Sequence, residues 1–77
     1  MVDHLLEITV EAEGARGAAL AGALSAAGFA LRTRRGRAVA GSASVQAGEA
    51  KELLRALGFL DREYRVHVEY TRGWGFL

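Results

Sequence analysis

Hydrophobic and polar residues alternate near the start of the chain. Leu6, Ile8 and Val10 alternate with Glu7, Thr9 and Glu11, a period of two that is typical of a strand with one buried face. The alanine-rich run 15–27 consists mostly of good helix formers, and Gly28 stands where a left-handed residue commonly ends a helix. We therefore predict a strand and then a helix that ends at Gly28.

The middle of the chain has the pattern of a hairpin followed by a second helix. Two alternating runs, 29–34 and 39–45, flank the dipeptide Arg35-Gly36, which favours a tight turn. In the following segment, 49–57, one helical face carries the apolar residues and the other the charged ones. The predicted buried face of this helix consists of Ala50, Leu53, Leu54 and Leu57. Gly58 ends the helix, and alternation around Val66 and Val68 predicts a last strand.

The predicted order is strand, helix, strand, strand, helix, strand. A weak internal repeat supports it, because residues 23–29 resemble residues 53–59. Two βαβ halves of this kind are typical of an α+β fold, the ferredoxin-like βαββαβ plait. We predict one such domain over residues 1–77, with a four-stranded antiparallel sheet, the first and third strands central, and two helices on one face.

The face of the sheet away from the helices is predicted to be polar. We assign Leu6, Ile8, Val10, Val39, Val66 and Val68 to the helix-facing side, which leaves a strip of small residues, Ala38, Ala40, Ser42 and Ser44, on the other. Neither central strand presents an aromatic residue there, so the base stacking of an RNA-recognition motif is not expected. A strip of small residues flanked by charges instead permits a second sheet or a helix of a partner to pack closely against this face.

Composition narrows the class of protein. With 51% hydrophobic and 25% charged residues the chain is expected to be globular, and without cysteine it has neither a disulfide nor a thiolate metal site. No basic leader or membrane-spanning run is seen, so a cytoplasmic location is expected. The sequence contains no recognisable set of catalytic residues. His4 and His67 could be two ligands of a metal ion, but no third metal ligand stands at a characteristic spacing from them. We predict no enzyme, no metal and no cofactor.

The hairpin is strongly basic although the formal net charge of the chain is only +1. Its arginines are Arg32, Arg34, Arg35 and Arg37. They would suit contacts with the phosphate backbone of a nucleic acid, without base readout. Alternatively, they keep an exposed edge strand soluble and prevent edge-to-edge pairing.

Two apolar features indicate a homo-oligomer. The first helix has no charged residue between Arg16 and Arg32, so a partner could pack against Ala19, Ala23 and Ala26. The C-terminal residues Trp74, Phe76 and Leu77 are also too apolar to be left in solvent, and we expect them to pack on this domain or its neighbour.

Four segments follow one another in a telling order: Ile8-Thr9-Val10-Glu11, the loop glycine Gly14, the helix end Ala26-Ala27-Gly28-Phe29, and the helix Glu49–Phe59 before a final strand. Together, over about residues 6 to 70, they resemble an ACT domain. The resemblance implies a regulatory or assembly module that binds an amino acid or another small effector, usually across a dimer.

By the same resemblance the ligand site would consist of Glu13, Gly14, Ala15, Arg16 and Gly17. Backbone N–H groups at a helix N-terminus attract an anion such as a carboxylate, and glycines allow it to come close. Three functions thus remain open: a small-ligand regulator, a nucleic-acid-binding plait that uses hairpin 32–37, and a structural assembly subunit.

Overall fold

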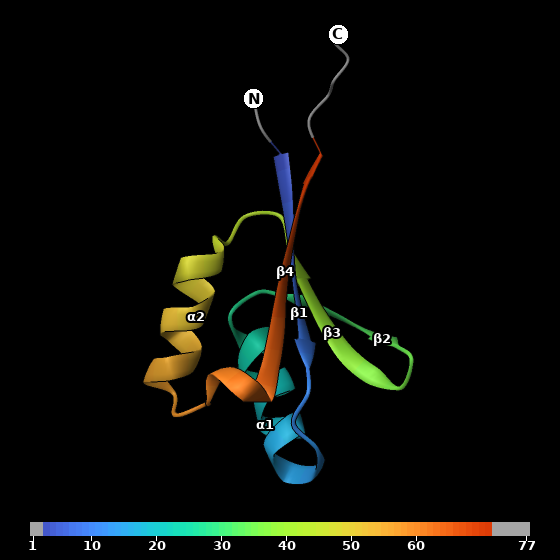
Figure 1. The fold of residues 1–77 in the computed structure, drawn as a ribbon, viewed down its shortest axis with the longest axis vertical. Helices are drawn as coiled ribbons and strands as arrows, with labels where there is room; N and C mark the ends of the chain where they lie inside the picture. The colour runs from blue at the N-terminus through green and yellow to red at the C-terminus, as the bar shows by residue number, and fades with distance from the viewer. Residues whose placement is uncertain (1–2, 72–77) are drawn as a thin grey trace, which may run out of the picture.

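The computed structural model describes residues 3–71. Its elements in chain order are β1 (Asp3–Val10), α1 (Gly14–Ala26), β2 (Ala30–Arg34), β3 (Arg37–Ser42), α2 (Ala47–Ala56), the short 3-10 helix η1 (Asp61–Glu63) and β4 (Tyr64–Thr71). The predicted α+β class and the order of strands and helices are confirmed (Figure 1).

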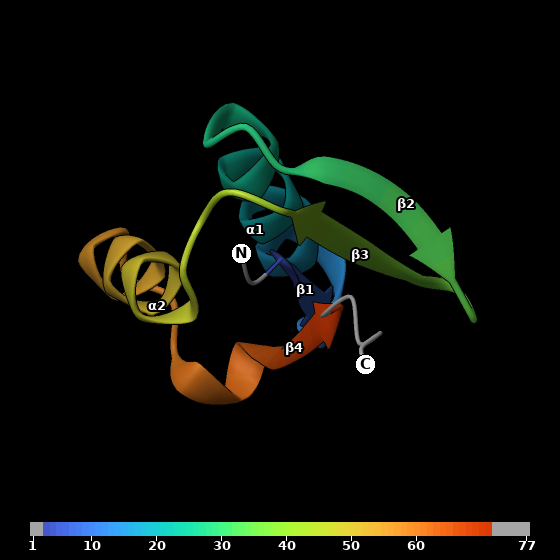
Figure 2. The ribbon, with the colours of Figure 1, turned by 90° about the horizontal axis from the view of Figure 1, so that it is seen from above.

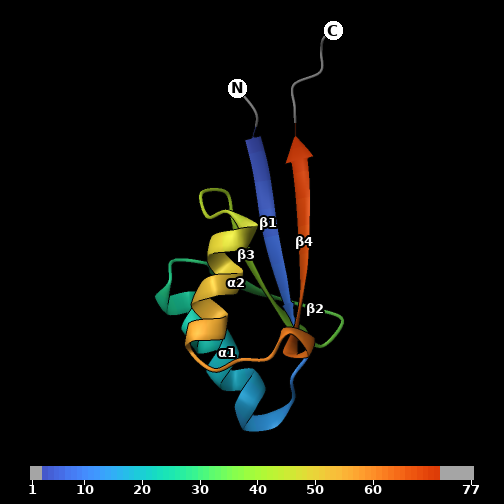
Figure 3. The same ribbon diagram turned by 60° about the vertical axis from the view of Figure 1, so that its left-hand side comes forward.

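All four strands form one antiparallel sheet in the order β2-β3-β1-β4, so β1 and β3 are central, as the sequence predicts. β1 pairs with β4 from Asp3 to Val10, whereas β3 lies opposite only Leu6 to Thr9 of β1. The first residues of β1 and the last of β4 therefore extend beyond β3 as a two-stranded ribbon, visible at the top of Figure 3.

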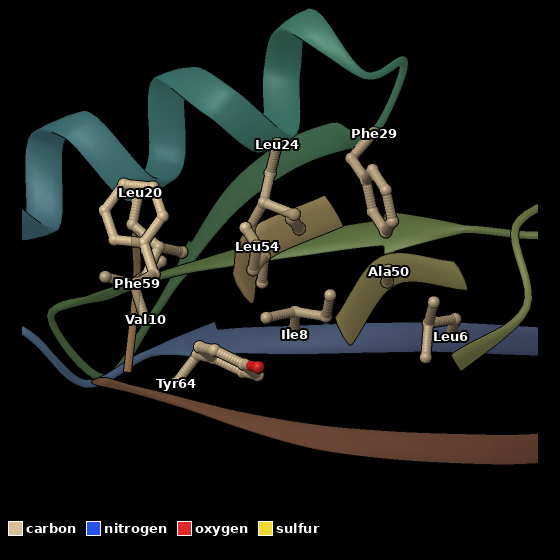
Figure 4. Close-up of a cluster of buried hydrophobic side chains, with 11 residues drawn as sticks. Leu6, Ile8, Val10, Leu20, Leu24, Phe29, Ala50, Leu54, Phe59 and Tyr64 are labelled. Atoms are coloured by element: carbon tan, nitrogen blue, oxygen red, sulfur yellow. The ribbon is translucent and has the colours of Figure 1, made fainter. Parts of the chain in front are cut away.

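The hydrophobic core lies between the sheet and both helices. Leu6 and Ile8 of β1 form one buried cluster with Leu20 and Leu24 of α1 and with Leu54 of α2. Figure 4 shows these side chains meeting between the helices and the sheet, so α1 and α2 cover the same face. Fully burying each large aliphatic side chain contributes about 1.5–3 kcal/mol, which makes this cluster the main source of stability.

The prediction of which β3 side chains face the helices is wrong, because the alternation is shifted by one residue. Ala40 lies opposite Ile8, and Ser42 lies opposite Leu6, so both face the helices instead of forming an open strip. Val39, predicted for the core, lies opposite Thr9 on the open face, where it is still only 1% exposed because neighbouring side chains cover it. Alanine, glycine and serine give no hydrophobic alternation from which to read the register.

The two-residue turn before β3 fixes this register. Arg35 has φ 54° and Gly36 has φ 78°, the pair of positive values that a type I′ turn requires. Because the turn contains only these two residues, Arg34 pairs directly with Arg37, and every later pairing in the hairpin follows from that one. The predicted turn position is therefore confirmed.

α2 buries a narrower face than the sequence indicates. Ala50 and Leu54 are buried, but Leu53 and Leu57 are 36% and 52% exposed. The view in Figure 2 shows the reason, because α2 stands at the side of the helix layer and α1 covers the middle of the sheet. A helix in that position contacts the core along one stripe only, so Leu54 is buried and the other two predicted core leucines, Leu53 and Leu57, remain outside.

Both long helices end in the same local structure. After α1, Gly28 has φ 97°, its N–H donates to Ser25 O at 3.0 Å, and the N–H of Phe29 donates to Leu24 O at 3.0 Å. Gly58 and Phe59 repeat this arrangement after α2. These are Schellman motifs, in which the phenylalanine after the glycine packs back on the core. The predicted helix ends at Gly28 and Gly58 are confirmed.

The left-handed glycines permit a stability test. A Cβ at position 28 would meet no atom within 4 Å, so the substitution Gly28→Ala introduces backbone strain without a clash. We expect it to lower the free energy of unfolding by about 1–2 kcal/mol, measured by urea denaturation. The matched control is Gly48→Ala in α2, which also has open space but no positive φ and should not destabilise. Equal loss in both variants would contradict the assigned helix end.

Candidate functional site

A surface groove of about 480 Å³ lies between the start of α1 and the turn that joins β2 to β3. One wall comes from the segment that links β1 to α1, and the other comes from the hairpin. The lining residues are Val10, Ala12, Glu13, Gly14, Gly17, Ala18, Ala21, Arg35, Gly36, Arg37 and Ala38. The fold thus brings three residues of the predicted ligand loop together with two arginines of the predicted basic hairpin.

The loop beside this groove is held tightly. The backbone N–H groups of Glu11 and Ala12 both donate to Glu63 O, at 2.9 and 3.0 Å. On the helix side, Ala12 O approaches Gly17 so closely that a Cβ there would lie 2.3 Å from it. Gly17 therefore has a packing role, since only a residue without a side chain allows the loop to lie against α1.

Charges of both signs border the groove above an apolar wall. The carboxylate of Glu13 and the guanidinium of Arg35 form no ion pair with any other side chain in residues 3–71. The Glu13 side chain does not cap α1 either, and the first turn of that helix contains no acidic residue. The wall consists of Val10, Ala18, Ala21 and Ala38. This arrangement can hold a small molecule that carries an anion, a cation and an apolar group.

Arg16, also predicted for the ligand site, lies elsewhere. Its Nε donates to Glu63 Oε2 at 2.9 Å and its Nη2 to Glu63 Oε1 at 2.6 Å, and the guanidinium lies 4.8 Å from the centre of the Phe59 ring. The hydrogen bond from Arg16, with a second from the Leu60 backbone, lowers the pKa of Glu63 to about 2. Arg16 thus joins α1 to the segment before β4, and Ala15, which is exposed, does not line the groove either.

The hairpin arginines mostly fold over the open face of the sheet. Arg32 and Arg34 both pair with Glu7 of β1, the latter at 3.2 Å. Arg37 pairs with Glu11 at 3.3 Å, and Arg65 of β4 approaches the same carboxylate at 3.6 Å. Two carboxylates are therefore each bracketed by two guanidiniums.

Glu7 is the most buried of these charged groups, with 7% of its surface exposed. Burial favours its neutral form, but the hydrogen bonds and positive charges of Arg34 and Arg32 outweigh this effect and hold the pKa of Glu7 below its ordinary value. Sequence reasoning missed Glu7 and Glu11 as partners of the hairpin. Glu7 and Glu11 lie on the same face of the first strand, and this spacing could have suggested them as partners of the arginines. The pairing can be predicted only when the register of the strands is known.

The two histidines lie on opposite faces of the sheet. His4 Nε2 lies 3.1 Å from Val45 O, and its register partner is Tyr70, whereas His67 lies opposite Glu7 on the open face. Within the described residues, no group of three or more histidines and carboxylates is placed to hold a metal ion.

The predicted interface residues are only partly accessible. Ala19 and Ala26 are exposed on α1, but Ala23 packs against the core. Trp74, Phe76 and Leu77 lie outside the described residues. Neither α1 nor α2, the helices of the described part of the chain, has the length and apolar character needed to cross a bilayer.

Comparisons with protein-family models, with curated proteins and with solved structures found no match to this chain. The site is therefore interpreted from its own geometry.

Proposed function

We propose that this chain is a ferredoxin-like, ACT-like regulatory module that binds a small amino acid in the groove between α1 and the β2–β3 turn. The strand order β2-β3-β1-β4, with both helices on one face, supports the ferredoxin-like plait. The position of the groove, at the start of the first helix, agrees with the ligand site that the ACT resemblance implies.

The observation that carries the proposal is that one groove is lined by the oppositely charged residues Glu13 and Arg35, which form no ion pair, and by apolar residues. An amino acid is a zwitterion, so its carboxylate would bind Arg35 and the free N–H groups of α1, and its ammonium would bind Glu13. The wall formed by Val10 and three alanines would receive a small aliphatic side chain. A groove of about 480 Å³ also falls within the range usual for small-molecule sites.

Self-association belongs to the same proposal, because the ACT resemblance implies a ligand site that is usually formed across a dimer. The exposed alanines Ala19 and Ala26 lie seven residues apart on one side of α1, in the part of the helix after Arg16 that has no charged residue, and they are the proposed contact with a second copy. The sheet does not offer an alternative surface for this contact, because Ala40 and Ser42 of the predicted small-residue strip face the helices.

The proposal predicts that alanine or valine binds to the protein, as measured by calorimetry. Binding should require both charged groups of the ligand and residues from both walls of the groove. Arg35→Gln should weaken binding at least about tenfold, since it removes a charge-assisted hydrogen bond. Ala18→Leu, at an exposed helical position in the lining, should block the groove. Light scattering on the same samples reports the oligomeric state with and without the amino acid.

The controls separate the groove from general effects. Arg62→Gln removes an exposed positive charge outside the groove, and Ala56→Leu enlarges an exposed alanine of α2. Both should bind as the parent does. The proposal fails if no amino acid binds, or if propionate and ethylamine, which each carry one charge only, bind as tightly as alanine.

A further inference from the structure

A second groove, of about 560 Å³, lies on the open face of the sheet and shares no residue with the first. Its lining comes from β1, β2 and β4. The residues are Leu5, Glu7, Thr9, Arg32, Arg34, Arg65, His67 and Glu69. Three guanidiniums and an imidazole thus border one groove together with two carboxylates.

Glu7 positions two of these guanidiniums. It stands on β1, two strands away from Arg32 and Arg34 on β2, a separation of about 10 Å at the usual strand spacing. Because both side chains reach Glu7, they cross β3 and end above β1. The residue of β3 opposite Glu7 is Gly41, which places no side chain in their path.

β4 approaches the same point from the other side. His67 lies directly opposite Glu7, and Arg65 lies opposite Thr9, so both neighbour the arginine–glutamate cluster. His67 Nε2 lies 3.8 Å from Glu69 Oε2, and Arg65 is 3.6 Å from Glu11. Side chains from both edge strands therefore line the same groove on the open face of the sheet.

The groove has more positive than negative charge. When the ion-pair partners of the lining residues are included, four guanidiniums face three carboxylates, because Glu11 pairs with both Arg65 and Arg37. Glu7 shares its charge between Arg32 and Arg34. A guanidinium has five N–H donors, so both arginines retain donors after binding Glu7. The buried carboxylate fixes their positions beforehand, which lowers the entropy lost when a ligand binds.

We propose that this groove binds a phosphate group. A tetrahedral phosphate offers several oxygens to donors that converge from different directions, and guanidinium forks match it well. Arg32 and Arg34 would bind from the β2 side, and Arg65 and His67 from the β4 side. The lining contains no phenylalanine, tyrosine or tryptophan, so the groove offers no stacking platform and would recognise phosphate without reading a base.

The test is a calorimetric titration with inorganic phosphate, compared with chloride at equal ionic strength. Arg65→Gln is the main variant, because Arg65 is 76% exposed on its side chain and does not touch Glu7, so the fold is not at risk. We expect about tenfold weaker phosphate binding, both for this variant and for Arg32→Gln. Arg62→Gln, the matched control outside the groove, should bind phosphate as the parent does.

Further titrations identify the source of the phosphate. If uridine monophosphate and an oligothymidine bind with the same sensitivity to Arg65→Gln, the groove accepts phosphate both from small esters and from a nucleic-acid backbone. If only inorganic phosphate and the monophosphate bind, small molecules are the source. Binding no stronger than that of chloride, or equal weakening by Arg65→Gln and Arg62→Gln, would overturn the proposal. Arg35→Gln should leave phosphate binding unchanged, which separates this site from the amino-acid groove.

Discussion

Leu54→Ala is expected to lower the free energy of unfolding by about 2–5 kcal/mol. Leu54 is fully buried and packs in the cluster with the leucines of α1 and with Ile8. Removing its isobutyl group leaves a cavity among side chains that the sheet and two helices hold in place, so collapse into the space is limited. In a domain of 77 residues a loss of this size is a large part of the total stability.

The matched control is Leu57→Ala, at the C-cap of α2. Leu57 is 52% exposed, so the same substitution removes little buried surface and should cost less than about 1 kcal/mol. Urea denaturation followed by circular dichroism measures both variants. Similar losses at positions 54 and 57 would show that α2 buries the wider face that the sequence pattern indicates.

Gly17→Ala is expected to destabilise the protein by about 1–3 kcal/mol, although alanine is the better helix former. The new Cβ would lie 2.3 Å from Ala12 O and 3.1 Å from Ala12 C, and both atoms belong to the backbone. The loop or the start of α1 must shift to accommodate it. Because that loop borders the proposed amino-acid groove, the variant should also bind the ligand more weakly.

Gly22→Ala is the control in the same helix. A Cβ at this position would meet nothing within 4 Å, so helix propensity alone decides the result. We expect a gain of up to about 1 kcal/mol in the free energy of unfolding. A gain in both variants would show that α1 does not approach Ala12 closely and that Gly17 has no packing role.

The sequence placed part of the loop that lines the candidate groove. Glu13, Gly14 and Gly17 were predicted to lie together between the first strand and the first helix, and all three line the groove because such a segment must lie at the end of the sheet. Arg35 and Arg37 were assigned to a different site, and Arg16 to this one. Nothing local distinguishes an arginine that points into a groove from one that pairs with Glu63, which lies 47 residues away in the chain.

The sequence by itself determined the order of the strands and long helices, the hairpin turn and the ends of both helices, but it did not predict η1 or the bounds of β3, which is Arg37–Ser42 instead of 39–45. The strand–helix order, the turn at Arg35-Gly36 and the helix ends at Gly28 and Gly58 depend on the conformations of a few consecutive residues, so the local pattern specifies them. Only the tertiary structure decided which side chains meet. The facing of β3, the exposure of Leu57 and the pairing of Glu7 with Arg32, 25 residues later, depend on neighbours across the sheet. Such contacts depend on the register between strands and on the position of each helix over the sheet. A local pattern of small residues, leucines and arginines does not determine either of these.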